Sequence, residues 1–136
     1  MTSVLVVDDD EAIRDILYDL LSGKHACQTA ETAEQALARL AVNRYDVVLT
    51  DISMPGLSGL ELLGHVLQRH PGTPVIVISG ISDQTHAQGL IKLGAFDYLL
   101  KPFRLEAVEK SVKRAIEYGQ RLAAANWEIV RDDSHA

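Results

Sequence analysis

The sequence predicts an α/β domain built on a doubly wound, five-stranded parallel sheet. Short apolar runs rich in β-branched residues alternate along the chain with segments of helical periodicity, in the order βαβαβαβαβα. The apolar runs show no in/out alternation, as expected for strands buried on both faces. The 136 residues correspond to one domain of ordinary size.

The strands are predicted from these runs and from the turn residues that end them. The first strand covers residues 4–7, Val-Leu-Val-Val, and the acidic run Asp8–Asp10 ends it. The remaining strands are predicted at 25–29, 46–50, 75–78 and 95–99. The run at 25–29 is the weakest and is expected at an edge, whereas 75–78 is the most apolar. Pro55 and Gly56 mark residues 52–57 as a loop.

The helices are predicted from capping residues and apolar stripes. Asp9 or Asp10 can cap a first helix that ends near Gly23. Its apolar stripe consists of Ile13, Ile16, Leu17, Leu20 and Leu21. A capping box at Thr32–Gln35 predicts a second helix, whose apolar residues are Ala33, Ala36, Leu37 and Leu40. A capping box at Ser58–Glu61 predicts a third helix that runs through about Arg69. Further helices are predicted from Ser82 or Asp83 to about Leu93, and from Arg104 or Leu105.

Polar residues follow four of the predicted strands, at the edge where open parallel sheets bind ligands. They are Asp8 and Asp9, Asp51, Ser79 and Lys101. Clustered carboxylates repel one another unless a cation is present, and hard oxygen ligands favour Mg²⁺. A carboxylate can also act as a nucleophile and form an aspartyl phosphate. The predicted chemistry is therefore Mg²⁺-assisted phosphorylation of an aspartate, with the Lys101 ammonium and the Ser79 hydroxyl neutralising the phosphoryl oxygens.

Four segments at these strand ends carry a combination that is typical of one family. They are Val4–Asp10, Leu49–Gly59, Val75–Gly80 and Gly94–Phe103. In this combination, over about residues 3–120, the chain closely resembles the receiver domain of bacterial two-component response regulators. The resemblance implies the flavodoxin-like receiver fold, with strand order 2-1-3-4-5.

The resemblance also implies a role for each site residue. Asp51 would accept a phosphoryl group from the phosphohistidine of a sensor histidine kinase. Mg²⁺ would be held by Asp9 directly, by Asp8 mostly through water, by Asp51 and by the backbone carbonyl of Ser53. Lys101 would contact the phosphoryl group and form a cis peptide bond with Pro102.

Ser79 and Tyr98 match the family's switch pair, in which the hydroxyl moves toward the phosphoryl group and the tyrosine rotates inward. The fourth helix, fifth strand and last helix would carry the signal to a partner or output domain. Two positions depart from the common pattern: Ser79 stands where Thr is commoner, and Gly80 where Ala is usual.

Two other functions share parts of this pattern. A Mg²⁺-dependent phosphohydrolase with an aspartyl nucleophile usually has a second Asp two residues later, where this chain has Ser53. A nucleotide- or flavin-binding module would carry a Gly-rich first loop, whereas this loop is acidic. We therefore expect a switch rather than an enzyme, with at most self-catalysed phosphotransfer and autodephosphorylation.

Charge and the lack of long apolar segments indicate which partners and which cellular location to expect. The net charge of −6 argues against direct contact with nucleic acid. The sequence shows no signal peptide and no apolar run near the ~18 residues of a membrane span, so we expect no membrane contact and a cytoplasmic location.

We place the receiver domain at residues 1–120 and expect the last helix to continue beyond it. Its apolar seam has alternating spacings of three and four: Leu105, Val108, Val112, Ala115, Gly119, Leu122, Asn126 and Ile129. The first half of the seam must serve the domain core. Residues 121–136, with Trp127 and Val130 and a polar tail from residue 131, can form a homodimer contact, link to an output domain or fold back.

Overall fold

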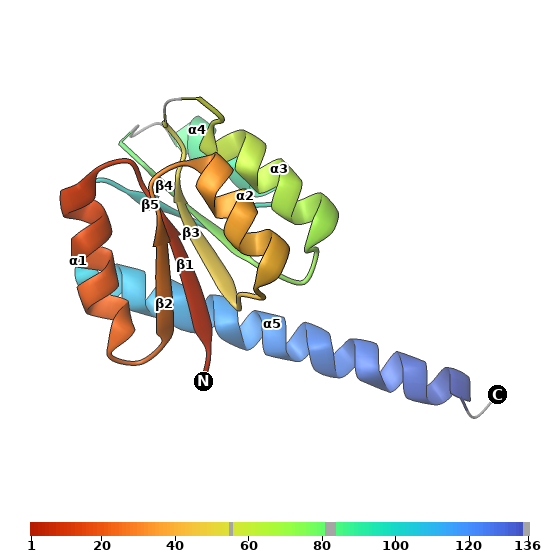
Figure 1. Ribbon diagram of the computed structural model, residues 1–136. Coiled ribbons are helices and arrows are strands. Elements are labelled where there is room, and N and C mark those ends of the chain that lie inside the picture. The colour runs from red at the N-terminus through yellow and green to blue at the C-terminus, as the bar shows by residue number, and fades with distance from the viewer. Residues whose placement is uncertain (55, 81–83, 135–136) are drawn as a thin grey trace.

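The computed structural model describes residues 1–54, 56–80 and 84–134. In these ranges five strands alternate with five helices (Figure 1). The elements are β1 (Ser3–Val7), α1 (Glu11–Ser22), β2 (Ala26–Ala30), α2 (Ala33–Val42), β3 (Val47–Asp51), α3 (Gly59–Arg69), β4 (Val75–Ser79), α4 (Gln84–Lys92), β5 (Asp97–Leu100) and α5 (Leu105–Ser134).

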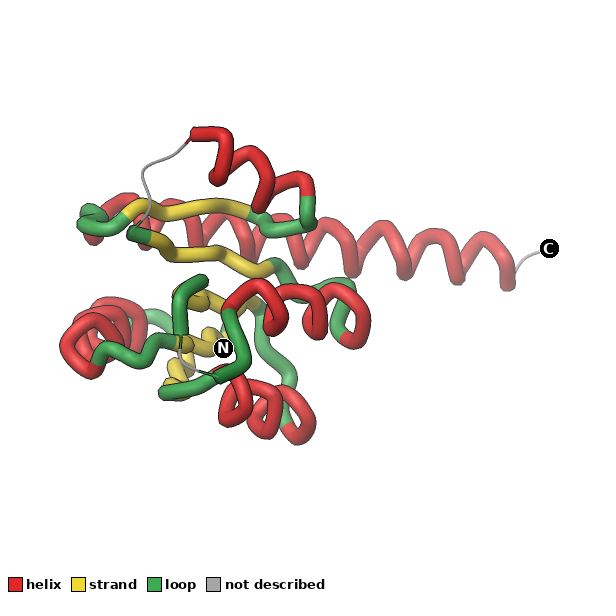
Figure 2. The backbone as a smooth tube through the Cα atoms, turned by 90° about the horizontal axis from the view of Figure 1, so that it is seen from above, coloured by secondary structure: helices red, strands yellow, loops and turns green. Residues whose placement is uncertain are grey.

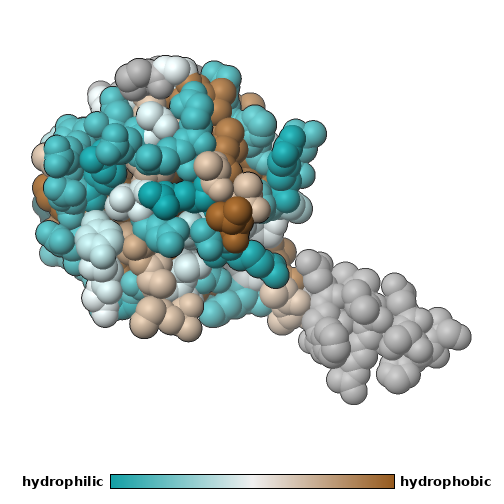
Figure 3. Space-filling view, in the orientation of Figure 1, coloured by the Kyte–Doolittle hydropathy of each residue, from teal (hydrophilic) through white to brown (hydrophobic). Residues whose placement is uncertain are grey.

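All strand pairs are parallel, and the order β2-β1-β3-β4-β5 confirms the predicted fold and topology. The sheet separates two apolar layers. Leu5, Val7, Val48 and Val77 pack toward α2, α3 and α4, while Val4, Val6, Leu49 and Ile76 pack toward α1 and α5. Figure 2 shows the helices on the two sides of the sheet. The outer face of α2 and α3 is mainly hydrophilic, with an apolar strip between polar regions (Figure 3).

The caps explain where the first three helices begin. Asp10 accepts from the N–H groups of Ala12 and Ile13, and Ser58 forms the complete capping box with Glu61. The box predicted at Thr32 forms only in part. Thr32 accepts from the Gln35 N–H, but the Gln35 side chain accepts from the Glu31 N–H rather than from Thr32.

The structure differs from local predictions in α1 and at β5. Ile16, predicted on the buried stripe of α1, is 48% exposed, because the stripe that reaches the core is narrower and centred on Leu17 and Leu21. β5 covers residues 97–100 rather than 95–99: its register with β4 starts at the Ile76–Asp97 pair, and before it only the Phe96 N–H donates to β4, at the Val75 carbonyl. The predicted caps of the fourth helix, Ser82 and Asp83, lie outside the described residues.

α5 is one continuous helix of 30 residues that leaves the body of the domain (Figures 1 and 2). Val108, Val112 and Ala115 are buried against the sheet, whereas Leu105 is 45% exposed, so the seam begins one turn later than predicted. The helix runs to Ser134 without folding back, and it includes residues predicted as a polar tail. The side chains of residues 126–134, Trp127 among them, lie outside the described part of the chain. No helix in the described ranges is both long enough and apolar enough to cross a membrane.

Gly59, the first residue of α3, fixes how closely this helix approaches the end of β3. A Cβ atom there would lie 2.1 Å from the Asp51 carbonyl oxygen and 2.7 Å from the Ile52 Cα. The neighbours are backbone atoms, which cannot turn aside as a flexible side chain can. Only glycine therefore allows this contact between α3 and the residue that carries the Asp51 carboxylate.

Replacing Gly59 with alanine should destabilise the domain, because the new methyl group overlaps the β3 backbone. We expect the free energy of unfolding to fall by about 1–3 kcal/mol, as for overpacked sites. Gly64→Ala is the matched control in the same helix, since its Cβ would meet nothing within 4 Å. It should raise stability by roughly 0.5–1 kcal/mol. Urea denaturation measures both, and equal behaviour of the two variants would contradict the packing argument.

Candidate functional site

The carboxylates predicted to share one site do lie together at the carboxyl edge of the sheet. Asp8 directly follows β1 and Asp51 is the last residue of β3. Carboxylate oxygens of Asp8, Asp9 and Asp51 all lie within 4.8 Å of one another. Asp8 is fully buried and Asp51 is 5% exposed, while Asp9 faces solvent. The site is thus a half-buried acidic cluster that is open on one side.

Lys101 supplies the positive charge of this cluster. Its Nζ lies 3.4 Å from Asp8 Oδ2 and 3.3 Å from Asp51 Oδ2. The Lys101 N–H donates to the Ser79 carbonyl at 2.7 Å, which continues the β4–β5 pairing past the strand. The Lys101–Pro102 peptide bond is cis, as predicted. Lys101 is therefore positioned both by its backbone and by two carboxylates.

Burial and charge act on the pKa values of Asp8 and Lys101 in opposite ways. Burial raises the pKa of Asp8, and the nearby Asp51 carboxylate adds to this, although the Asp10 N–H and Lys101 oppose it. Burial alone would lower the pKa of Lys101, but the attraction of Asp8 and Asp51 outweighs it and raises that pKa. The ammonium consequently stays charged, while Asp8 holds its charge at an energetic cost.

The donor set fits a hard divalent cation. Asp8 Oδ2 is buried and accepts no hydrogen bond from the described residues, with only the ion pair to Lys101 beside it. Oxygen donors from several carboxylates are what Mg²⁺ prefers. The Ser53 N–H donates to Asp51 Oδ1 at 3.3 Å, which places the backbone of Ser53 directly beside the cluster.

Arg14 is a residue of this site that the sequence analysis did not single out. Its Nη1 donates to the Asp8 carbonyl at 2.8 Å, and its Nη2 lies 3.8 Å from Glu31. The side chain is only 12% exposed. It therefore braces the turn between β1 and α1. The available signal was its place in the first turn of α1, four residues after Asp10.

Ser79 and Tyr98, the predicted switch pair, lie on neighbouring strands. Ser79 is fully buried at the end of β4, and Val77 pairs with Tyr98 in the β4–β5 register. Because side chains alternate along a strand, Ser79 and Tyr98 share the face of the sheet that α4 covers. The Tyr98 ring also makes an edge contact with His86 of α4, at 6.2 Å between centroids. This contact of His86 was not predicted from the sequence.

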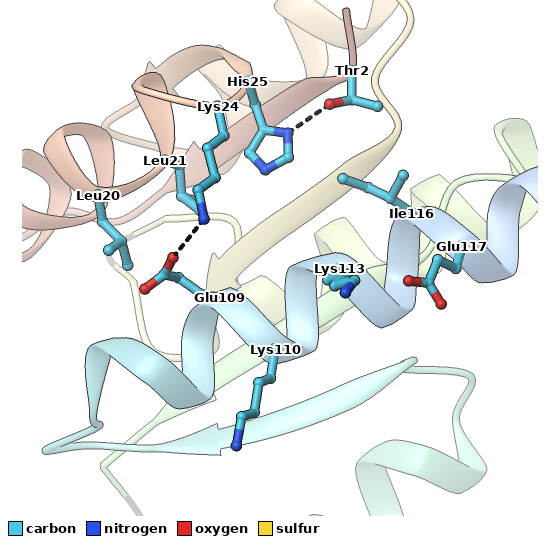
Figure 4. A pocket seen from close by; sticks show the side chains of 10 residues that line it. All are labelled: Thr2, Leu20, Leu21, Lys24, His25, Glu109, Lys110, Lys113, Ile116 and Glu117. Carbon is cyan, nitrogen blue, oxygen red and sulfur yellow. Dashed lines mark hydrogen bonds and ion pairs between the residues drawn. The ribbon is translucent and has the colours of Figure 1, made fainter.

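A cavity of about 280 Å³ lies at the opposite end of the sheet, between the end of α1, the loop that follows it and α5 (Figure 4). Leu20, Leu21 and Ile116 form its apolar lining. An ion pair of 3.4 Å between Lys24 and Glu109 joins the loop after α1 to α5, while Thr2 Oγ1 lies 2.5 Å from His25 Nδ1. Thr2 precedes β1, so this cavity is remote from the carboxylates at the other end of the strands.

Comparisons with known proteins agree on one family. The sequence model of the response regulator receiver domain matches residues 4–113. The DNA-binding transcriptional regulator NtrC of Salmonella typhimurium is 46% identical over 118 residues, which are 86% of this chain and 25% of the relative. The chain therefore spans about a quarter of the length of this relative.

Solved structures give the same answer. A receiver domain protein from Clostridium thermocellum matches with a TM-score of 0.83 and 31% identity, over 90% of this chain and 99% of that one. NtrX from Brucella abortus, solved in complex with ATP, matches with a TM-score of 0.86 and 35% identity. That match covers 91% of this chain and 29% of NtrX.

Removing one carboxylate from the cluster should weaken Mg²⁺ binding, because the attraction of one charge is lost. We expect Asp9→Asn to lower the affinity about tenfold or more, equivalent to at least about 1.4 kcal/mol. The control is Asp10→Asn, since Asp10 caps α1 and asparagine caps equally well. Calorimetric titration with MgCl₂ measures both. If Asp10→Asn weakens binding as much as Asp9→Asn does, the effect is general surface charge rather than a site.

Proposed function

This chain belongs to the family of response regulator receiver domains, and on that premise we propose that Asp51 is its phosphoacceptor. Receiver domains of this family are signalling switches that act by accepting a phosphoryl group. The observation that carries the assignment is the position of the Asp51 carboxylate. It lies at the carboxyl edge of the sheet, 3.3 Å from the Lys101 ammonium and within reach of Asp8 and Asp9.

Asp8, Asp9, Asp51 and the backbone carbonyl of Ser53 would hold Mg²⁺ in this site. When bound, the ion neutralises negative charge on the transferred group. The orphaned Oδ2 of Asp8 supports this role, because a buried carboxylate oxygen without a hydrogen bond is otherwise costly.

The transfer itself uses two side chains of this chain. A carboxylate oxygen of Asp51 attacks the phosphorus of a kinase phosphohistidine, the P–N bond breaks, and the imidazole nitrogen retains the electron pair and takes up a proton. The Lys101 ammonium, already beside Asp51, turns toward a phosphoryl oxygen. Asp8 and Asp51 raise the pKa of Lys101, so the ammonium is charged before the transfer begins.

Ser79 and Tyr98 would convert the modification into a change of surface. The Ser79 hydroxyl moves toward the new phosphoryl oxygens, and Tyr98 rotates into the space that it leaves. Tyr98 contacts His86 in its present position, so this rotation would release a contact between β5 and α4. The signal would leave through α4, β5 and α5.

The phosphohydrolase alternative has no support from the comparisons. The position for a second carboxylate holds Ser53, whose hydroxyl is a poor general acid or base at neutral pH. We propose that self-catalysed phosphotransfer and autodephosphorylation are the only reactions of this chain.

The partners follow from the same proposal. A sensor histidine kinase would donate the phosphoryl group, and an output domain or a separate protein would receive the signal. NtrC is a DNA-binding regulator, and this chain matches about a quarter of it, so contact with DNA would belong to an output region rather than to this acidic domain. We propose a cytoplasmic location. Residues 1–120 would act as the receiver, and residues 121–136 as a helical extension that links to an output region or forms a homodimer.

Asp51→Asn should abolish modification of the protein by acetyl phosphate with MgCl₂. Mass spectrometry of the intact protein measures the added phosphoryl group. Asp10→Asn, which changes a neighbouring exposed carboxylate, should be modified like the wild type. Labelling that survives Asp51→Asn would contradict the assignment, and rapid multiple turnover of a phosphomonoester would indicate an enzyme instead.

Ser79→Ala should separate phosphorylation from switching, because it removes the hydroxyl that senses the phosphoryl group. We expect beryllofluoride to bind Asp51 in this variant but to produce a smaller change of backbone NMR shifts in α4 and β5. Ser79→Thr keeps the hydroxyl and should respond like the wild type. Equal shift changes in all three proteins would show that the hydroxyl is not the sensor.

A further inference from the structure

Glu34, the second residue of α2, reaches across to the loop between β3 and α3. We propose that Glu34 is a positioning residue for the cation site, acting through residues 52–58, which we call the β3–α3 loop. The inference rests on the proposed function in one respect, namely that Ser53 of this loop contributes its carbonyl to the site. Glu34 itself touches none of the three clustered carboxylates that define the site.

The contact is a charged hydrogen bond to the backbone. The Leu57 N–H donates to Glu34 Oε1 at 2.9 Å. This bond is the main reason why the pKa of Glu34 lies below its ordinary value. Glu34 is an exposed residue, so burial does not force its carboxylate into this position. The side chain therefore stays on the loop because of the hydrogen bond that it accepts.

Backbone hydrogen bonds fix both ends of the β3–α3 loop. The Ile52 N–H donates to the Ile78 carbonyl at 3.0 Å, and the Gly59 N–H donates to the Ile52 carbonyl at 3.1 Å. Ser58 belongs to the capping box of α3. Between these ends, the Ser53 N–H donates back to the Asp51 carboxylate of β3, and the Leu57 N–H donates to Glu34 of α2. Glu34 thus holds the loop at Leu57 against α2.

Gly56 gives the loop the backbone conformation and the space that the Glu34 carboxylate needs. Gly56 adopts φ +76°, which L side chains rarely tolerate. A Cβ atom at this position would also lie 3.2 Å from Glu34 Oε1, a tight contact. The glycine therefore satisfies the turn and leaves room for the Glu34 carboxylate at the same time.

The tether is connected to the cation site through a short stretch of backbone. Ile52 and Met54 are buried in the core, and between them the Ser53 N–H donates to Asp51 Oδ1 at 3.3 Å. Residues 56 and 57 lie three and four positions after Ser53 in the chain, so a shift of these residues away from α2 would pull on the backbone that carries the Ser53 carbonyl. Loss of the tether should consequently loosen the Ser53 carbonyl while leaving the carboxylates of Asp8 and Asp9 in place.

The test compares Glu34→Ala with Glu34→Gln in the full chain. Alanine removes the acceptor, whereas glutamine keeps an oxygen that can accept from the Leu57 N–H. We expect Glu34→Ala to lower the Mg²⁺ affinity about tenfold, within the range for outer partners of metal ligands, and Glu34→Gln to stay within about threefold of the wild type. Calorimetric titration with MgCl₂ measures both. The acetyl phosphate reaction adds a second readout, since the Mg²⁺ concentration at half-maximal rate should rise for Glu34→Ala while the rate at saturating Mg²⁺ stays near wild type.

Glu106→Ala is the matched control, because Glu106 is an exposed carboxylate at the second position of α5, as Glu34 is in α2. It should bind Mg²⁺ like the wild type. The inference is overturned if Glu34→Ala binds Mg²⁺ like the wild type, or if Glu106→Ala weakens binding as strongly as Glu34→Ala does. Failure of the proposed function has a different signature: the wild type would then bind Mg²⁺ without any effect of Asp9→Asn, or would be modified at a residue other than Asp51.

Discussion

The Lys101 ammonium lies between the carboxylates of Asp8 and Asp51, at 3.4 Å and 3.3 Å, where the apolar sheet ends. A buried charge without a partner costs several kcal/mol, so the Lys101 ammonium, together with the Asp10 N–H, offsets the burial of the Asp8 carboxylate. The bridge in turn depends on strand order. β1, β3, β4 and β5 are neighbours in that order, and the Lys101 N–H is fixed to the Ser79 carbonyl. The pairing of the strands therefore also positions the ammonium that balances the buried carboxylates.

The same bridge leaves the site short of positive charge. Three carboxylates face one ammonium, so two negative charges remain in excess when all of them are ionised. A divalent cation matches this excess, and a phosphoryl group on Asp51 would bring new negative charge into a place that the cation and Lys101 already serve. On the proposed function, a cation held by these carboxylates would lower the repulsion before the phosphoryl group arrives. Without it, an incoming phosphoryl group would meet a cluster that repels it.

The sequence was sufficient to predict what depends on order along the chain. Buried strands appear as apolar runs, and the residues after them share one edge, so the positions of Asp8, Asp51, Ser79 and Lys101 could be predicted before any geometry was known. The contacts of Arg14 and Glu34 could not, because they depend on how a helix is tilted toward a loop from elsewhere in the chain. Gln35 illustrates the same limit, since it fits a capping box by spacing yet accepts from Glu31.

The parts of the site differ in how firmly they are held, and this difference bears on how a switch can work. Asp8, Ile52 and Lys101 each donate a backbone hydrogen bond to a neighbouring strand or to the residue that ends it. These positions cannot move without breaking sheet pairing, so a change in charge at Asp51 must be absorbed elsewhere. Two places can absorb it. One is the β3–α3 loop, held in its middle by Glu34, and the other is the end of β4, where a Cβ on Gly80 would meet nothing within 4 Å. Ser79 is buried beside Gly80 and Tyr98 contacts His86, so on the proposed function a movement at the second place would reach α4 through this ring contact. On the proposed function, the backbone of the sheet edge stays in place while the Lys101 and Ser79 side chains respond to the phosphoryl group, so the larger displacement would occur on the side of β4 and β5.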